Sequence, residues 1–287
     1  MIDLGGAVGA PANVSVPLQI VGGTEPVAHI SVNGGKSVPV LVDTGSTGLV
    51  IPLQDIGIKS LGFPTGIGLG GYSGGIDYIF LTFNAPVNFG NGVVSAPTAI
   101  NVPIISWPVS IQAALTNGWT FSSYFANDGV VGVLGVGANA GGPSYSTPTT
   151  ALAGGLSNGV LINEPANTLT FGPAPTGLTE LGSVSGSPIG NLLISTDGGV
   201  HTTSITSFVD SGGVYGTIPS NVGWQQGDTI TVYDSAHNKL YSYTPTADIA
   251  PTVIPAGETA NTGYYPFSQM PIYTDYTVYG GQTIFYQ

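Results

Sequence analysis

The chain has 287 residues, of which 42% are apolar, enough for a sizeable core and about two domains. It carries 15 acidic residues, three lysines and no arginine, so its net charge is −12. Neutralising phosphates requires clustered Lys and Arg, which argues against a nucleic-acid partner and an anionic membrane surface. The absence of cysteine excludes disulfides, thiolate nucleophiles and Cys-ligated zinc.

Short apolar or alternating runs bounded by Gly, Pro or Asn recur along the whole chain, which is typical of an all-β fold. The predicted strands cover 14–21, 28–32, 38–42, 77–83, 159–162, 168–171, 192–195, 229–233 and 240–243. Helical spacing occurs only at 109–116 and 146–154, where it predicts short surface helices.

Gly- and Pro-rich stretches at 137–143 and 172–186 indicate loops. The second divides the chain into a predicted N-terminal lobe, 1–172, and a C-terminal lobe, 173–287. No run of about 18 apolar residues is present, so we expect no membrane insertion. The opening, MIDLGGAVGAPANV, lacks the basic and apolar regions of a signal peptide.

An internal repeat is the strongest signal in the sequence. Residues 42–52 read VDTGSTGLVIP and residues 209–219 read VDSGGVYGTIP, so that Asp43 and Asp210 occupy matched positions. Composition alone predicts about 0.3 Asp-[Ser/Thr]-Gly triplets in the chain. Two are found, each preceded by an apolar strand. We infer two similar β lobes whose motif loops lie side by side.

The repeated triplet suits a pair of interacting carboxyl groups. Glycine lets the backbone approach closely, and the small hydroxyl residue supports the turn. Two carboxyl groups in one low-dielectric cleft share a proton and titrate as a pair. One can then act as a base on water while the other, protonated, polarises a peptide carbonyl, with no metal or cofactor. An Asx-turn at a strand end would explain either triplet alone, but not the matched pair.

These motifs resemble those of the pepsin-like aspartic proteases. The first motif matches at Asp43-Thr44-Gly45-Ser46-Thr47 and the second at Asp210-Ser211-Gly212. The apolar-apolar-Gly elements that thread the two active-site loops correspond to Val133-Leu134-Gly135 and Val278-Tyr279-Gly280. The Gly-, Ala- and Asn-rich composition and the opening GGAVGAPANVSVPLQIVGG are similar to the protease-like C-terminal domains of mycobacterial PE and PE_PGRS surface proteins.

The resemblance implies an all-β, bilobed fold with a cleft between the lobes, and it implies a role for each matched residue. Asp43 and Asp210 would be the catalytic pair, supported by Thr44, Ser46 and Ser211. The residues expected to contact substrate are Gly45, Gly212, Leu41, Val133 and the flap tyrosine Tyr72, within Gly71-Tyr72-Ser73-Gly74-Gly75.

Three departures from the family pattern stand out. Gly213 replaces a Ser or Thr, so Asp210 is expected to lack a hydroxyl partner that Asp43 retains. Val50 replaces a tryptophan that commonly braces the flap tyrosine. Only seven residues follow Gly280, fewer than the terminal strands of the family need, so the chain is expected to be trimmed there.

Other chemical patterns are weaker. Ser73 lies in a Gly-x-Ser-x-Gly pattern, but about 0.6 such matches are expected by chance and no strand-turn-helix context surrounds it. His29, His201 and His237 are scattered without metal-ligand spacing.

The sequence leaves two functions open. The favoured one is an aspartic endopeptidase that cleaves polypeptides with apolar residues around the scissile bond. The alternative is a catalytically weak or inactive surface antigen or binding module. We expect a monomeric domain of a longer exported chain, located outside the cell, at its surface or in its envelope.

Overall fold

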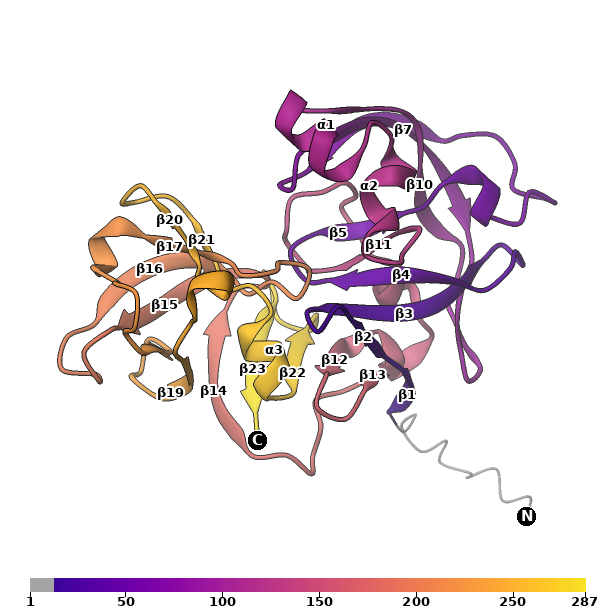
Figure 1. Ribbon diagram of the computed structural model, residues 1–287. Coiled ribbons are helices and arrows are strands. Elements are labelled where there is room, and N and C mark those ends of the chain that lie inside the picture. Colours follow the sequence, from indigo (N-terminus) through magenta and orange to yellow (C-terminus); the bar gives the residue numbers. More distant parts are fainter. Residues whose placement is uncertain (1–12) are drawn as a thin grey trace, which may run out of the picture.

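The computed structural model describes residues 13–287. Residues 1–12, most of the opening segment that lacks the features of a signal peptide, lie outside the described residues. Three β-sheets account for the architecture, and the chain forms two lobes above a shared base (Figure 1). The prediction of an all-β, two-lobed fold is confirmed.

A ten-stranded sheet forms the N-terminal lobe, in the order β6-β7-β10-β5-β11-β4-β3-β8-β9 with β2 paired to β3. Its strands are β2 (Gln19–Val21), β3 (Glu25–Val32), β4 (Val38–Asp43), β5 (Thr47–Val50), β6 (Gly66–Tyr72), β7 (Ile76–Ala85), β8 (Val87–Gly90), β9 (Val93–Val94), β10 (Thr98–Pro108) and β11 (Gly132–Val136). The hairpin between β3 and β4 turns at Asn33 and Gly34, both with positive φ, as tight hairpins require.

A seven-stranded sheet forms the C-terminal lobe, in the order β19-β18-β15-β16-β21-β17-β20. Its strands are β15 (Ile189–Ser195), β16 (Thr203–Phe208), β17 (Thr217–Pro219), β18 (Ile230–Tyr233), β19 (Lys239–Tyr243), β20 (Thr252–Ile254) and β21 (Ala260–Asn261).

Strands from both ends of the chain build the six-stranded base, in the order β1-β13-β12-β22-β23-β14. They are β1 (Val14–Pro17), β12 (Gly159–Asn163), β13 (Thr168–Phe171), β14 (Glu180–Ser185), β22 (Ile272–Asp275) and β23 (Gln282–Tyr286). The predicted lobe boundary at 172/173 falls between β13 and β14, within this sheet, and it stays a prediction. The last strand, β23, pairs with β14 and with β22, so the residues after Gly280 do form a terminal strand of the base sheet. The expectation that the chain is trimmed there stays a prediction.

Three short α-helices lie on the surface of the sheets: α1 (Ile111–Asn117), α2 (Phe121–Ala126) and α3 (Tyr265–Gln269). The first confirms the helix predicted at 109–116, and the Ser110 hydroxyl caps it by accepting from the Ala113 N–H. The helix predicted at 146–154 is wrong, because two 3₁₀ turns, Pro148–Ala151 and Gly154–Asn158, occupy that region.

A continuous core of aliphatic and aromatic side chains joins the lobes and the base. A second, smaller cluster surrounds Tyr78 beneath the hairpin of β6 and β7. Across residues 13–287, no helix is long and apolar enough to cross a membrane.

Candidate active site

The first motif loop is held between two strands of its own lobe. Asp43 ends β4, and β11 pairs in parallel with β4 so that Gly135 lies beside Asp43. The same β11 pairs antiparallel with β5 on the other side of the loop. Val133-Leu134-Gly135 therefore threads the loop, as the sequence predicts.

The second motif loop repeats this arrangement with a different segment from the one expected. β21 pairs in parallel with β16, placing Asn261 opposite Phe208, and it also pairs antiparallel with Thr217 of β17. When this register is continued, Asn261-Thr262-Gly263 lies beside the second motif loop, where Val133-Leu134-Gly135 lies beside the first. The assignment of Val278-Tyr279-Gly280 is wrong, since these residues form an exposed turn between β22 and β23. The apolar pattern could not find the true segment because two of its residues are polar.

Four reciprocal hydrogen bonds join the two motif loops. The Thr44 N–H donates to Ser211 Oγ at 3.1 Å, and the Ser211 N–H donates to Thr44 Oγ1 at 2.9 Å. Each hydroxyl then donates across the lobe boundary at 2.7 Å, from Thr44 to the Val209 carbonyl and from Ser211 to the Val42 carbonyl. Both hydroxyl residues are buried, so this network fixes the loops side by side as predicted.

The same loops bring Asp43 and Asp210 together. A Cβ on Gly45 would lie 2.6 Å from Asp210 Cγ, and one on Gly212 would lie 2.7 Å from Asp43 Oδ1. Only glycine fits between each motif and the opposite carboxyl group. The Gly45 N–H donates to Asp43 Oδ1 at 2.7 Å, and the Gly212 N–H donates to Asp210 Oδ1 at 2.9 Å. Contacts of these glycines with substrate stay a prediction.

The environment of Asp43 disfavours its charged form. Burial, and after it the charge and hydrogen bonding of Asp210, raise the pKa of Asp43 well above its usual range. Hydrogen bonds from the Ser46 hydroxyl, at 2.5 Å to Asp43 Oδ2, and from Gly45 oppose that shift.

As expected, no hydroxyl among residues 13–287 donates to the Asp210 carboxyl group, but an amide takes its place. Gly213 has no side chain, but Asn261 Nδ2 donates to Asp210 Oδ2 at 2.5 Å. Sequence reasoning missed Asn261 because it lies on a separate strand, far along the chain from the Asp-Ser-Gly motif. Locating it requires the pairing of β21 with β16.

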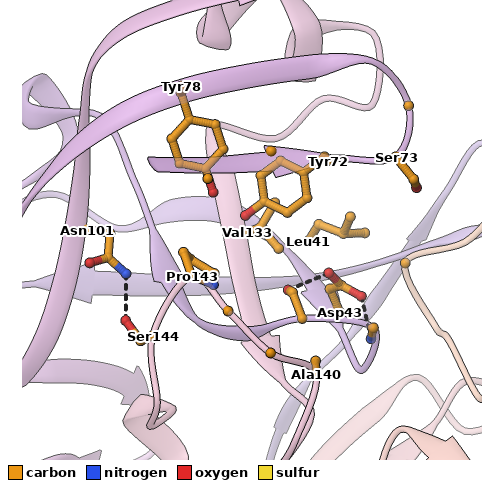
Figure 2. A pocket seen from close by; sticks show the side chains of 18 of the residues that line it. Leu41, Asp43, Tyr72, Ser73, Tyr78, Asn101, Val133, Ala140, Pro143 and Ser144 are labelled. Carbon is orange, nitrogen blue, oxygen red and sulfur yellow. Dashed lines mark hydrogen bonds between the residues drawn. The ribbon is translucent and has the colours of Figure 1, made fainter. Parts of the chain in front are cut away.

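A cleft of about 1320 Å³ contains the two aspartates and is lined by both lobes. The hairpin of β6 and β7 forms a flap on one side of it. Figure 2 shows the ring of Tyr72 pointing from this flap toward Leu41, Val133 and Asp43. The structure thus places all ten residues singled out above in this cleft or in the loops beneath it. Their catalytic and binding roles stay predictions.

The flap tyrosine is supported without a tryptophan. The Tyr72 ring stacks on Tyr78, with centroids 5.7 Å apart, and meets the edge of Phe125 at 5.5 Å. Val50 belongs to the same apolar cluster. The flap tip is tethered by Asn117, whose amide donates to the Gly74 carbonyl at 3.2 Å. Ser73 lies at this tip, in a strand-to-strand turn, and not at a nucleophile elbow (Figure 2).

Two further features of the cleft were not predicted. The loop 140–146 lines one side, and Asn101 anchors it by donating to Ser144 Oγ at 2.6 Å (Figure 2). Glu25 and Asp128 also line the cleft. Burial, followed by the charges of Asp128 and Asp210, raises the pKa of Glu25 to about 8. Across residues 13–287, no group of three or more His, Cys, Asp or Glu side chains could hold a metal ion.

Buried glutamates predict that the fold is more stable in mild acid than in mild base. Burial, and then the charge of Glu25, raise the pKa of Glu164 to about 8 from 4.5. Its Oε1 is buried and has no hydrogen-bond partner among the described residues. The pKa of Glu164 is higher in the folded state than in the unfolded state. Its contribution to the free energy of unfolding is therefore complete below about pH 4.5 and is lost as pH rises through about 8.

We expect Glu164→Gln to flatten the pH dependence of the free energy of unfolding between pH 5 and 8, by on the order of a few kcal/mol. Urea unfolding at a series of pH values measures this. Glu258→Gln, at an exposed position, is the matched control. An unchanged slope in Glu164→Gln would contradict the assignment.

Two β lobes that each supply an Asp-[Ser/Thr]-Gly loop to one cleft define the aspartic-peptidase-like class of proteins. Within that class, the chain belongs to the family described as the PE-PGRS C-terminal aspartyl peptidase-like domain, whose model matches residues 14–284. This confirms the resemblance inferred from the motifs.

Curated relatives carry the name PE cleavage protein A. Those from two strains of Mycobacterium tuberculosis are each 47% identical to this chain over 290 residues, covering 94% of this chain and 51% of their own length. One from Mycobacterium marinum is 45% identical, covering 94% of this chain and 52% of its own. The chain therefore spans about half the length of these relatives.

Proposed function

We propose that this domain is an aspartic endopeptidase that hydrolyses peptide bonds with a water molecule activated between Asp43 and Asp210. The observation that carries the proposal is the buried, hydrogen-bonded pair of motif loops, which places two carboxyl groups against each other at the floor of the cleft. The relatives at 45–47% identity are named for cleavage, which supports the same chemistry.

In this mechanism the two carboxyl groups act as an acid and a base. Asp210, ionised, takes a proton from the water that attacks the peptide carbon. Asp43, whose pKa is raised by burial and by Asp210, donates its proton to the carbonyl oxygen. A tetrahedral diol forms and then breaks down as the amide nitrogen accepts a proton, so no covalent enzyme intermediate is needed.

The cleft suits an extended polypeptide. It is lined by residues of both lobes and is bordered on one side by the flap. Leu41 and Val133 are apolar and lie beside Asp43, with Tyr72 nearby (Figure 2). Phe125 also lines the cleft and packs against Tyr72. We propose that these residues accept apolar side chains next to the scissile bond.

The alternative of an inactive binding module rested on Gly213 and Val50. Asn261 donates the hydrogen bond to Asp210 that a side chain at 213 would have supplied. Tyr78 and Phe125 pack against the flap tyrosine in place of a tryptophan at position 50. These contacts support the endopeptidase over the binding module.

The test is cleavage of a casein-type protein or a peptide library between pH 3 and 8. We expect a bell-shaped profile with an acidic maximum, because the singly protonated pair exists only between its two ionisations. The rate falls toward neutrality as Asp43 loses its proton. Asp43→Ala should be inactive, and a pepstatin-type inhibitor should block the wild type. A rate that keeps rising through pH 8, or is flat from pH 4 to 8, would contradict the shared-proton mechanism.

We further propose that the domain acts as a monomer within a longer exported chain, outside the cell, at its surface or in its envelope. The greater length of the curated relatives supports a longer chain. Fractionation of cells that carry the epitope-tagged full-length protein tests the location, and finding it only in the cytosol would refute the proposal.

A further inference from the structure

The two aspartates receive their outer hydrogen bond from different residue types. On Asp43, the donor to Oδ2 is the hydroxyl of Ser46, three positions later in the chain. The residue three positions after Asp210 is Gly213. The donor to Asp210 Oδ2 is instead the side-chain amide of Asn261, from β21, at the same distance of 2.5 Å.

The orientation of the Asn261 amide is fixed at both ends. Its Oδ1 accepts from the Gly263 N–H at 2.8 Å, while its Nδ2 donates to Asp210. Turning the amide over would place its oxygen against a carboxylate and its NH₂ against an N–H donor. An amide nitrogen donates hydrogen bonds and does not accept them, whereas a hydroxyl does both.

The Asn261 side chain fills the space that a side chain at position 213 would need. A Cβ on Gly213 would lie 2.7 Å from Asn261 Oδ1 and 3.1 Å from Asp210 Oδ2. A side chain at 213 would therefore displace the Asn261 amide from its present position. The absence of a side chain at 213 is the condition that lets Asn261 reach the carboxylate.

We propose that Asn261 is a positioning residue: in place of a hydroxyl at position 213, its amide keeps Asp210 ionised and correctly oriented. Asp210 then acts as the base and Asp43 as the acid. The proposal rests on the proposed peptidase function and adds a division of labour to it. A donor-only amide favours the charged form of Asp210, while the Ser46 hydroxyl tolerates either form of Asp43.

The titratable groups that face the pair are all acidic or phenolic. They are Glu25 of β3, with Asp128 beside it, and the flap residues Tyr72 and Tyr78. Because the pKa of Glu25 is about 8, this residue is protonated at acidic pH and places no charge beside the pair there. The Asn261 amide is the side-chain donor that contacts the Asp210 carboxylate. Removing the Asn261 amide should therefore change mainly the first ionisation of the pair, the one at low pH, because this step creates the negative charge on Asp210.

The experiment compares Asn261→Ala, Gly213→Ser and the double variant. We expect Asn261→Ala to move the acid limb of the kcat profile to higher pH by about one to two units and to lower kcat about tenfold at the acidic end. Gly213→Ser alone should also be impaired, because its side chain collides with Asn261. The double variant, with a hydroxyl restored beside Asp210, should recover most of the activity and the wild-type acid limb.

Ser46→Ala is the matched control, since it removes the donor to Asp43 and should move the alkaline limb instead. Thermal unfolding confirms that each variant is folded, and Asn261→Ser replaces Asn261→Ala if that variant is not. The same shift is read without turnover from the ¹³C carboxyl signals of Asp43 and Asp210 in labelled protein, assigned with their Asn variants.

The two failures are distinguishable. An inactive wild type would overturn the proposed function, while the carboxyl titration would still decide the role of Asn261. An active wild type whose acid limb and first carboxyl titration are unchanged in Asn261→Ala would overturn the role of Asn261 alone. Additive losses in the double variant, with no recovery, would also overturn it.

Discussion

Replacing either Asp43 or Asp210 by asparagine is expected to lower kcat by on the order of 10⁴-fold or more while the fold stays intact. The amide has the shape of the carboxyl group, so the Asx-type bonds from Gly45 and Gly212 are kept. What is lost is one half of the acid and base pair. Because the two groups act as a unit, each single variant should be about as inactive as the double variant.

The same two substitutions should leave the thermal stability of the fold unchanged or raise it. Each substitution removes a buried acid whose charge repels its neighbour, so thermal unfolding above pH 6 is expected at the same or a higher temperature. Asp248→Asn, at an exposed position, is the control and should retain full kcat. Near-wild-type proteolysis by Asp43→Asn or Asp210→Asn would exclude the proposed mechanism.

The parts of the site that could be predicted from sequence are those encoded by contiguous residues. The Asp-[Ser/Thr]-Gly triplets specify a strand end, a close backbone approach and a hydroxyl partner within a few positions. Two copies with matched flanks then imply two lobes and one cleft. The flap motif around Tyr72 could be located for the same reason.

The remaining parts depend on pairing between distant strands. Asn261 reaches Asp210 only because β21 lies beside β16, and Val278 was assigned to that place by an apolar pattern that the second lobe does not keep. Helix α2 is six residues long, too short for a periodic signal, and is specified by its capping box at Thr120 and by the burial of Phe121 and Phe125. Packing of this kind leaves no regular trace in the sequence.

Removing the hydroxyls that join the lobes is the second change with a large expected effect. Thr44→Val leaves the buried Ser211 N–H and Val209 carbonyl without partners, and Ser211→Ala does the same to the Thr44 N–H and Val42 carbonyl. Each stranded group costs about 1–3 kcal/mol, so each variant should lose about 2–6 kcal/mol of unfolding free energy.

The pattern of losses distinguishes a network from a set of ordinary hydrogen bonds. Ser207→Ala removes an equally buried hydroxyl that, among the described residues, bonds only to the neighbouring Phe208 carbonyl, so it should cost far less than Ser211→Ala. Thr44→Ser keeps the hydroxyl and should stay near wild type. Because Thr44 and Ser211 bond to each other, the losses in the double variant should fall short of the sum.

Catalysis should be affected by the same substitutions even though neither hydroxyl touches the carboxyl groups. The four bonds set the distance between the Asp43 and Asp210 loops, and a displacement of about 1 Å at a reacting pair lowers the rate about 100-fold. Urea unfolding and kcat, measured on one set of variants, should therefore fall together for Thr44→Val and Ser211→Ala and remain unchanged for Thr44→Ser. A Ser211→Ala variant that unfolds like Ser207→Ala and keeps wild-type kcat would show that the lobes are aligned by the shared base sheet and not by the motif loops.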